Sequence, residues 1–283
     1  KLKLVIQIET QQYNCWVCGE SGVGVKRLAT KYFPFLTSEV ASIFKGVTSS
    51  TVVDTQDVTE YHNLELPKGF VLLSESSNCI DPDIKASKKY AMSRGMSKED
   101  LWYFKLCATP SGRFRNRVIM PSFDSEGVLN YYVARSVFKE AKMKYINSKV
   151  PKKDIIFNEI NVDWKKELTL VEGPFDLVKA NDNATCLLGC SLKEDQKLFR
   201  RIVENSTPIC LALDPDVSLK TYRIANLLNS YGITVRILDC TGYEDVGEMT
   251  KEQFVSRLET AVFFGRDQRL LDLITSIKSG SLI

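Results

Sequence analysis

Two pairs of carboxylates, Glu172/Asp176 and Asp214/Asp216, each come directly after a short apolar run. If these runs are neighbouring parallel strands, their carboxyl ends meet at one edge of a sheet, which is where ligands of open α/β folds bind. Carboxylate oxygens are the ligands that hard divalent cations prefer. The two pairs therefore predict a divalent metal site suited to phosphoryl chemistry.

The spacing within each pair lets both of its members face the same crevice. Gly173 allows a sharp turn after the first run, and Asp176 lies one helical turn beyond Glu172. Asp214 and Asp216 are two residues apart, so on an extended chain they point to one face. Helix caps and turns also favour aspartate, and they would explain one pair alone. Two pairs at successive strand ends favour the metal site.

A third acidic cluster, 244–248, follows a later apolar run and would reach the same edge of the sheet. Within this cluster, Asp245 is the residue that we expect to add a further metal contact. An acidic turn on the surface explains the cluster equally well.

The elements that must position these carboxylates alternate between strand and helix from residue 168 onward. Such alternation predicts an α/β fold with a parallel sheet, right-handed crossovers and helices on both faces. The expected strands are 168–171, 184–188, 209–213 and 233–238, and the expected helices lie near 175–181, 193–203 and 219–230. The tail, about 250–278, is expected to form one or two helices.

The chain before this array is basic and mixes helix and strand patterns. Residues 82–106 have a helical pattern, whereas 113–147 alternate like strands. Residues 79–160 hold 16 Lys and Arg against 9 Asp and Glu, whereas residues 161–283 hold 15 against 18. A basic segment beside an acidic one suits a surface for a polyanion next to a metal site. A solvated, lysine-rich surface explains the asymmetry as well.

Length and composition are those of a globular protein. The 283 residues suffice for one large or two modest domains, and no apolar run approaches the length of a membrane span. Most of the eight cysteines, such as Cys186, Cys210 and Cys240, lie in apolar runs and are expected to be buried thiols of a reducing compartment. Because the first residues resemble neither a signal peptide nor an initiator methionine, we expect further residues upstream.

Cys15 and Cys18 are closely spaced and resemble half of a zinc ribbon. A structural zinc site needs four ligands, and the sequence has no second Cys-x-x-Cys. Its single histidine, His62, falls in an expected linker. With no other histidine in the sequence, most Ser-His and multi-histidine chemistries are excluded. We therefore expect Zn²⁺ only if upstream ligands complete the site.

The ordered set of motifs resembles the DnaG-type primases, with a layout closest to the phage primases that work with a replicative helicase. The TOPRIM signature of that family, Glu-Gly-x-x-Asp and a later Asp-x-Asp, is matched at 172–176 and 214–216. Upstream, 113–121 resembles the basic motif of the family, and 144–148 resembles its Lys-Tyr-x-Asn-Ser element. The further matching segments are 89–95, 188–191 and 245–249, so the resemblance covers roughly residues 10–250.

The resemblance implies a DNA primase, an enzyme that synthesises short RNA primers on single-stranded DNA by two-metal phosphoryl transfer. Glu172, Asp214 and Asp216 would be catalytic and, with Asp176 and Asp245 in support, would hold Mg²⁺ or Mn²⁺. The side chains expected to contact template or triphosphate are Arg113, Arg115, Arg117, Arg135, Lys144 and Asn147. The first three of these are expected on one face of an extended strand.

The implied organisation is a partial zinc-ribbon module (1–45), a linker (46–77), an α+β basic part of the RNA polymerase core (78–165), a TOPRIM domain (166–249) and a C-terminal helical segment (250–283). The implied partners are single-stranded DNA, ribonucleoside triphosphates, the RNA primer, a replicative helicase and a single-strand-binding protein. The implied location is the cytoplasm of a bacterium or of a phage-infected host, away from membranes.

Two other interpretations stay open. A TOPRIM nuclease or topoisomerase would share the carboxylates but not the upstream basic motif. A non-catalytic protein that binds single-stranded DNA or a helicase on a primase-like core would bind template without incorporating nucleotides.

Overall fold

The computed structural model describes residues 4–6, 12–15, 21–23 and 64–265, except 190, 216 and 217. The chain divides into two compact units, Lys1–Thr59 and Glu60–Ile283.

The first unit contains a small antiparallel sheet with the strand order β1-β2-β3. Its strands are β1 (Leu4–Ile6), β2 (Gln12–Cys15) and β3 (Ser21–Val23). The buried ring of Tyr13 lies opposite Gly22, where a Cβ would come within 2.8 Å of the tyrosine hydroxyl. Glycine at this position therefore gives the ring the room that it needs.

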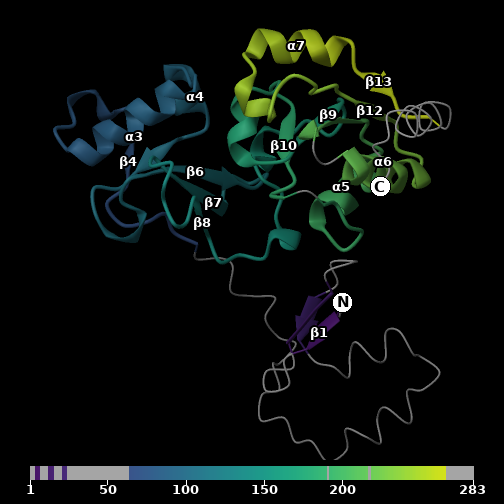
Figure 1. Ribbon diagram of the computed structural model, residues 1–283, viewed down its shortest axis with the longest axis horizontal. Coiled ribbons are helices and arrows are strands. Elements are labelled where there is room, and N and C mark those ends of the chain that lie inside the picture. Colours follow the sequence, from purple (N-terminus) through teal and green to yellow (C-terminus); the bar gives the residue numbers. More distant parts are fainter. Residues whose placement is uncertain are drawn as a thin grey trace, which may run out of the picture. The chain divides into compact units, whose positions relative to one another are not determined.

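Within the described residues, the second unit contains two five-stranded sheets (Figure 1). The first is antiparallel in the order β4-β5-β6-β7-β8. Its strands are β4 (Val71–Leu72), β5 (Cys107–Ala108), β6 (Arg117–Phe123), β7 (Leu129–Ser136) and β8 (Tyr145–Asn147). Helices α3 (Pro82–Ser93) and α4 (Lys98–Tyr103) lie between β4 and β5 in the chain. This part of the chain also contains the short 3₁₀ turns η3 (Ser76–Asn78), η4 (Gly112–Phe114), η5 (Lys152–Asp154) and η6 (Glu159–Asn161).

The second sheet has the order β10-β9-β11-β12-β13, and its strands are parallel except at β13. They are β9 (Leu168–Val171), β10 (Ala184–Cys186), β11 (Ile209–Ala212), β12 (Val235–Ile237) and β13 (Val262–Phe263). The connecting helices are α5 (Lys197–Asn205), α6 (Ser218–Ser230) and α7 (Lys251–Glu259), with 3₁₀ turns η7 (Pro174–Val178) and η9 (Val246–Glu248).

Alternate residues of the parallel strands pack into two different cores. Leu168 and Leu170 of β9 pack with Phe199 of α5 and Leu228 of α6. Val171, on the opposite face, belongs to the core that contains Phe254 of α7 and reaches into the antiparallel sheet. Helices therefore cover both faces of the parallel sheet, as the sequence predicts.

The structure corrects three expectations about elements. Residues 71–73 fall in the expected linker 46–77 but belong to the folded unit, because β4 pairs with β5 and Leu73 is fully buried in the core. The expected helix 175–181 is the shorter 3₁₀ turn η7, which begins at a proline. The C-terminal segment holds α7 but then forms the antiparallel edge strand β13, and residues 266–283 lie outside the described residues.

Candidate active site

Strand register brings the carboxylates of the two signature motifs to one edge of the parallel sheet. Val171, the last residue of β9, pairs with Cys186 of β10 and with Ala212 of β11. Glu172 directly follows β9, and Asp214 lies two residues past the end of β11. Both residues therefore reach the crevice at the carboxyl ends of the strands, where ligands bind in such sheets.

A cavity of about 380 Å³ lies at this edge, and side chains of both signs line it. Its carboxylates are Glu172, Asp176, Asp214 and Asp245, and its other polar side chains are Arg135, Lys144, Tyr145, Asn147 and Lys152. The acidic residues come from the parallel sheet, whereas Arg135, Lys144 and Asn147 come from β7, β8 and the loop between them. Asp216 lies outside the described residues, so its predicted role stays a prediction.

The environment of Asp176 disfavours its ionised form. Burial raises its pKa from 3.8 to about 6, and the nearby charges of Asp245 and Glu172 add to the increase. Two interactions act in the opposite sense: the Gly173 N–H donates to Asp176 Oδ2 at 2.8 Å, and Arg135 is close enough to attract the charge. The effects that raise the pKa of Asp176 exceed those that lower it. Without a cation, the ionised form of this carboxylate is therefore destabilised in the folded protein.

Gly247 gives two of these carboxylates close access to one another. A Cβ at this position would lie 3.0 Å from Asp245 Oδ1 and 3.2 Å from Asp176 Oδ1. It would also lie 3.2 Å from Arg94 Nη2. The missing side chain therefore leaves a small space that a carboxylate from each of two loops borders.

The donor set fits a divalent cation in chemistry. The donors are carboxylate oxygens, which suit Mg²⁺ or Mn²⁺, and Asp245 Oδ1 is buried without a hydrogen-bond partner. As they stand, no three Asp, Glu, His or Cys side chains within the described residues are close enough to form a finished metal site. The carboxylates would have to close around the ion, which the raised pKa of Asp176 favours because a cation relieves their repulsion.

Arg135 is held rigidly at the wall of the cavity. Its Nε donates to the Tyr90 hydroxyl at 2.9 Å, and its Nη1 donates to the Tyr145 hydroxyl at 2.8 Å. The guanidinium carbon lies 5.4 Å from the centre of the Tyr145 ring and 5.5 Å from that of Phe175. The side chain is thus fixed by aromatic residues of α3, β8 and η7 rather than by a carboxylate.

The three arginines of the basic motif do not reach this cavity. Arg115 forms an ion pair with Asp83 at the start of α3. Arg117 donates to the backbone carbonyls of Met143 and Lys144, so it holds the segment that carries Lys144. Arg113 is exposed in η4.

The expectation that these arginines share one face of a strand is wrong. Residues 112–114 form the turn η4, and β6 begins only at Arg117. Asn116 adopts a left-handed backbone conformation with φ 57°, which breaks the alternation just before the strand. Their predicted role in phosphate binding stays a prediction, on a surface outside the cavity.

The structure adds roles that the sequence did not predict. Lys152, outside the motifs, lines the cavity from η5, and Tyr90 and Phe175, inside matched segments, hold Arg135. Gly247 lies within the predicted acidic cluster, and a glycine between carboxylates was the available signal for a close backbone approach. Lys152 and Lys153 follow Pro151, and two adjacent lysines are too common on protein surfaces to indicate a site.

Two cysteine predictions have different outcomes. The thiols of Cys186, Cys210 and Cys240 are buried and free, as expected, and burial raises the pKa of each. Cys15 ends β2, but only its backbone is described, and Cys18 lies outside the described residues.

Among the described helices, none has both the length and the apolar character needed to cross a bilayer.

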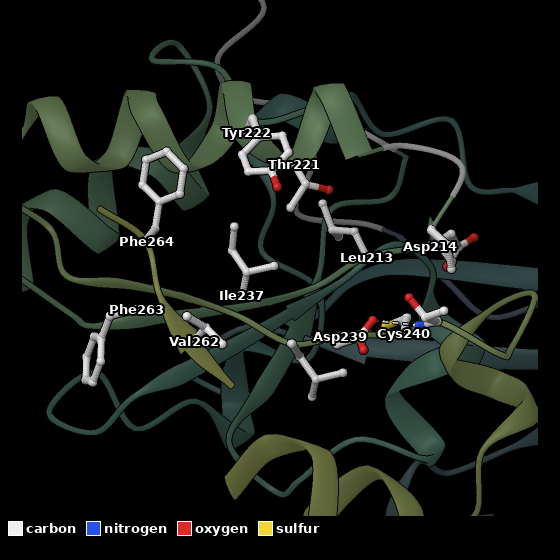
Figure 2. A pocket seen from close by; sticks show the side chains of 13 residues that line it. Leu213, Asp214, Thr221, Tyr222, Ile237, Asp239, Cys240, Val262, Phe263 and Phe264 are labelled. Carbon is white, nitrogen blue, oxygen red and sulfur yellow. Dashed lines mark hydrogen bonds between the residues drawn. The ribbon is translucent and has the colours of Figure 1, made fainter. Parts of the chain in front are cut away.

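A second cavity, of about 500 Å³, also has Asp214 in its lining (Figure 2). Thr221 and Tyr222 of α6 border it on one side, and strands β12 and β13 border it on the other. Its wall is apolar near Phe264 and acidic near Asp214 and Asp239. Asp214 lines both cavities, so it stands where the end of β11 separates them.

No family model matches the chain. A curated DNA primase of Clostridium acetobutylicum is 27% identical over an alignment that covers 90% of this chain and 51% of that protein. The chain thus spans about half the length of that relative.

Solved primase structures share the fold. The catalytic domain of a DnaG primase bound to single-stranded DNA matches with a TM-score of 0.55 and 20% identity, over 65% of this chain and 74% of that one. The Aquifex aeolicus primase, solved with its zinc-binding and RNA polymerase domains, matches with a TM-score of 0.55 and 19% identity, over 93% of this chain and 76% of that one. Similarity in sequence to a DNA primase and in fold to DnaG domains confirms the resemblance to DnaG-type primases that the motifs predict.

Proposed function

We propose that this chain carries the RNA-synthesising part of a DNA primase and joins ribonucleotides into short primers on single-stranded DNA. The observation that carries the proposal is the cavity in which Glu172, Asp176, Asp214 and Asp245 face Arg135 and Lys144. Carboxylates on one wall suit divalent cations, and cations on the other wall suit phosphates. Nucleotidyl transfer needs both groups at one place.

Each side chain has a distinct task in this proposal. Glu172, Asp214 and Asp216 hold Mg²⁺ or Mn²⁺, with Asp176 and Asp245 in support, and the bound ions supply charge neutralisation at the reacting phosphates. Arg135, fixed by Tyr90 and Tyr145, presents its charge to phosphate without having to be ordered on binding. Lys144 and Asn147 extend this wall along β8.

The proposed template is single-stranded DNA. The matched DnaG catalytic domain was solved with single-stranded DNA, and the exposed Arg113 lies on the basic part of this chain. A replicative helicase and a single-strand-binding protein stay predicted partners. Cys15 and Cys18 would supply half of a zinc site, and the matched Aquifex aeolicus structure includes a zinc-binding domain.

The test is ribonucleotide incorporation on single-stranded DNA with Mg²⁺ or Mn²⁺, with and without a pre-annealed primer. Asp214→Asn removes a predicted metal ligand with little change in shape, and it should abolish the RNA products. Asp239→Asn is the matched control, because Asp239 follows the neighbouring strand β12 but its side chain is 74% exposed and pairs with Arg257. The control should keep wild-type synthesis.

The other interpretations give different results in the same tubes. Cleavage of the DNA that depends on Asp214 would favour a nuclease. Binding of single-stranded DNA without synthesis or primer extension under either metal would favour a non-catalytic protein and would overturn the proposal.

A further inference from the structure

Lys152 is a cation of the cavity that is bonded to a neutral backbone carbonyl rather than to a carboxylate. Its Nζ donates to the Leu188 carbonyl at 2.7 Å, and among the described residues it forms no ion pair with a carboxylate. Arg135, in contrast, is 8% exposed and bonded to two tyrosine hydroxyls. Lys152 itself is exposed, so its ammonium group can leave the carbonyl without disturbing a core.

The carbonyl that accepts this bond belongs to the turn that follows β10. Leu188 has φ 54° and Gly189 has φ 149°, so the chain turns sharply there. The Gly189 N–H donates to the Glu172 carbonyl at 3.3 Å, which ties the same turn to the first signature carboxylate. Lys152 therefore links η5, which follows the antiparallel sheet, to the carboxyl edge of the parallel sheet.

The charge pattern of the cavity identifies the ligand class for Lys152. Four carboxylates face three cations there, so a ligand that brings both divalent metal and phosphate satisfies both walls. A lysine ammonium group binds phosphate as a point charge, and its bond to an anionic oxygen is stronger than its bond to a neutral carbonyl. A nucleoside triphosphate with its metal has this composition.

We propose that Lys152 binds the triphosphate of the incoming ribonucleotide and exchanges the Leu188 carbonyl for a phosphate oxygen when the nucleotide enters. The inference rests on the proposed function and adds a residue from outside the recognised motifs to its nucleotide site. Lys152 is a binding residue in this view, because its contact is with the phosphate chain rather than with the reacting hydroxyl.

The neighbouring lysine provides a matched control. Lys153 lies in the same turn η5, is also exposed, and does not line the cavity. Lys152→Ala and Lys153→Ala therefore remove the same charge from adjacent positions. Lys152→Arg keeps the charge and should retain most of the binding.

The experiment measures equilibrium binding of ATP and of AMP, both with Mg²⁺, to the full chain and its variants by calorimetry. Lys152→Ala should weaken ATP binding by about five- to twentyfold, as expected for one charge-assisted contact, and should change AMP binding far less. Lys153→Ala should bind both nucleotides like the wild type. Thermal unfolding of every variant checks that the fold is intact.

Three outcomes would overturn the inference. They are equal ATP affinities for the two alanine variants, an equal loss of ATP and AMP binding in Lys152→Ala, or reduced thermal stability with unchanged ATP binding, which would make Lys152 a structural link alone. RNA synthesis by the wild type is measured on the same preparation. If the wild type synthesises RNA but Lys152→Ala binds ATP normally, only the inference about Lys152 is refuted. If Lys152→Ala loses ATP binding but the wild type synthesises no RNA, only the primase proposal is refuted.

Discussion

Replacing Asp176 with asparagine should stabilise the metal-free protein, although it removes a predicted site residue. Burial and the charges of Asp245 and Glu172 raise the pKa of Asp176 from 3.8 to about 6. The folded protein therefore holds this group ionised at neutral pH at a cost. Asparagine has nearly the same shape, carries no charge, and keeps an oxygen to accept the hydrogen bond from the Gly173 N–H.

The size and sign of the effect follow from proton linkage. Between pH 3.8 and about 6 the folded state binds the proton that the unfolded state has released, so the wild type loses stability as pH rises through this interval. At about 1.4 kcal/mol for each pH unit, the full difference is about 3 kcal/mol above pH 7. At pH 4 the folded state is protonated and the unfolded state is partly so, and the two proteins should differ by less than about 1 kcal/mol.

Urea unfolding in EDTA at pH 8 and at pH 4 measures both limits. At pH 8 we expect Asp176→Asn to be more stable than the wild type by about 1–3 kcal/mol, or of the order of 5 °C in melting temperature. Asp163→Asn is the opposite control, because the Lys165 N–H lowers the pKa of Asp163 and its loss should not stabilise the protein. If Asp176→Asn is no more stable than the wild type at pH 8, the electrostatic argument for a metal-ready site is wrong.

Two further substitutions test the surroundings of the site. Gly247→Ala would force Asp245 Oδ1 away from a Cβ only 3.0 Å distant, so the Mg²⁺ concentration needed for half of the thermal stabilisation should rise about tenfold while metal-free stability changes little. An unchanged Mg²⁺ titration would mean that Asp245 does not contribute to the metal site. Arg135→Lys loses the bonds to the Tyr90 and Tyr145 hydroxyls and should lower the free energy of unfolding in urea by about 1–3 kcal/mol. A loss below a few tenths of a kcal/mol would show that these bonds do not hold β7 against α3 and β8.

The carboxylate edge was predictable because short-range patterns determine it. The four-residue runs that form β9 and β11 are buried throughout, and parallel register then brings whatever follows them to one place. Asp176 needed only the turn after Gly173, which its own side chain caps. These are local rules, and they held even though the expected helix at 175–181 is a 3₁₀ turn.

The basic wall was only partly predictable, because its assembly depends on contacts between distant segments. Arg135 and Lys144 reach the cavity because β7 and its loop to β8 border the parallel sheet, whereas Arg115 is drawn to Asp83, 32 residues earlier. Lys152 meets Leu188 across 36 residues. No spacing rule along the chain predicts such a contact.

The different fates of the basic residues also separate two tasks that one charged motif can serve. Arg117 donates to the Met143 and Lys144 carbonyls, and a guanidinium used in this way positions a neighbour rather than a ligand. Lys144 and Lys152 keep exposed ammonium groups at the cavity without a carboxylate partner among the described ion pairs. Arginine, with several donors in a fixed plane, suits the first task, and lysine, a mobile point charge, suits the second. In this cavity Lys152 should therefore exchange a protein contact for phosphate, while Arg135 presents its charge from a position that the Tyr90 and Tyr145 hydroxyls fix.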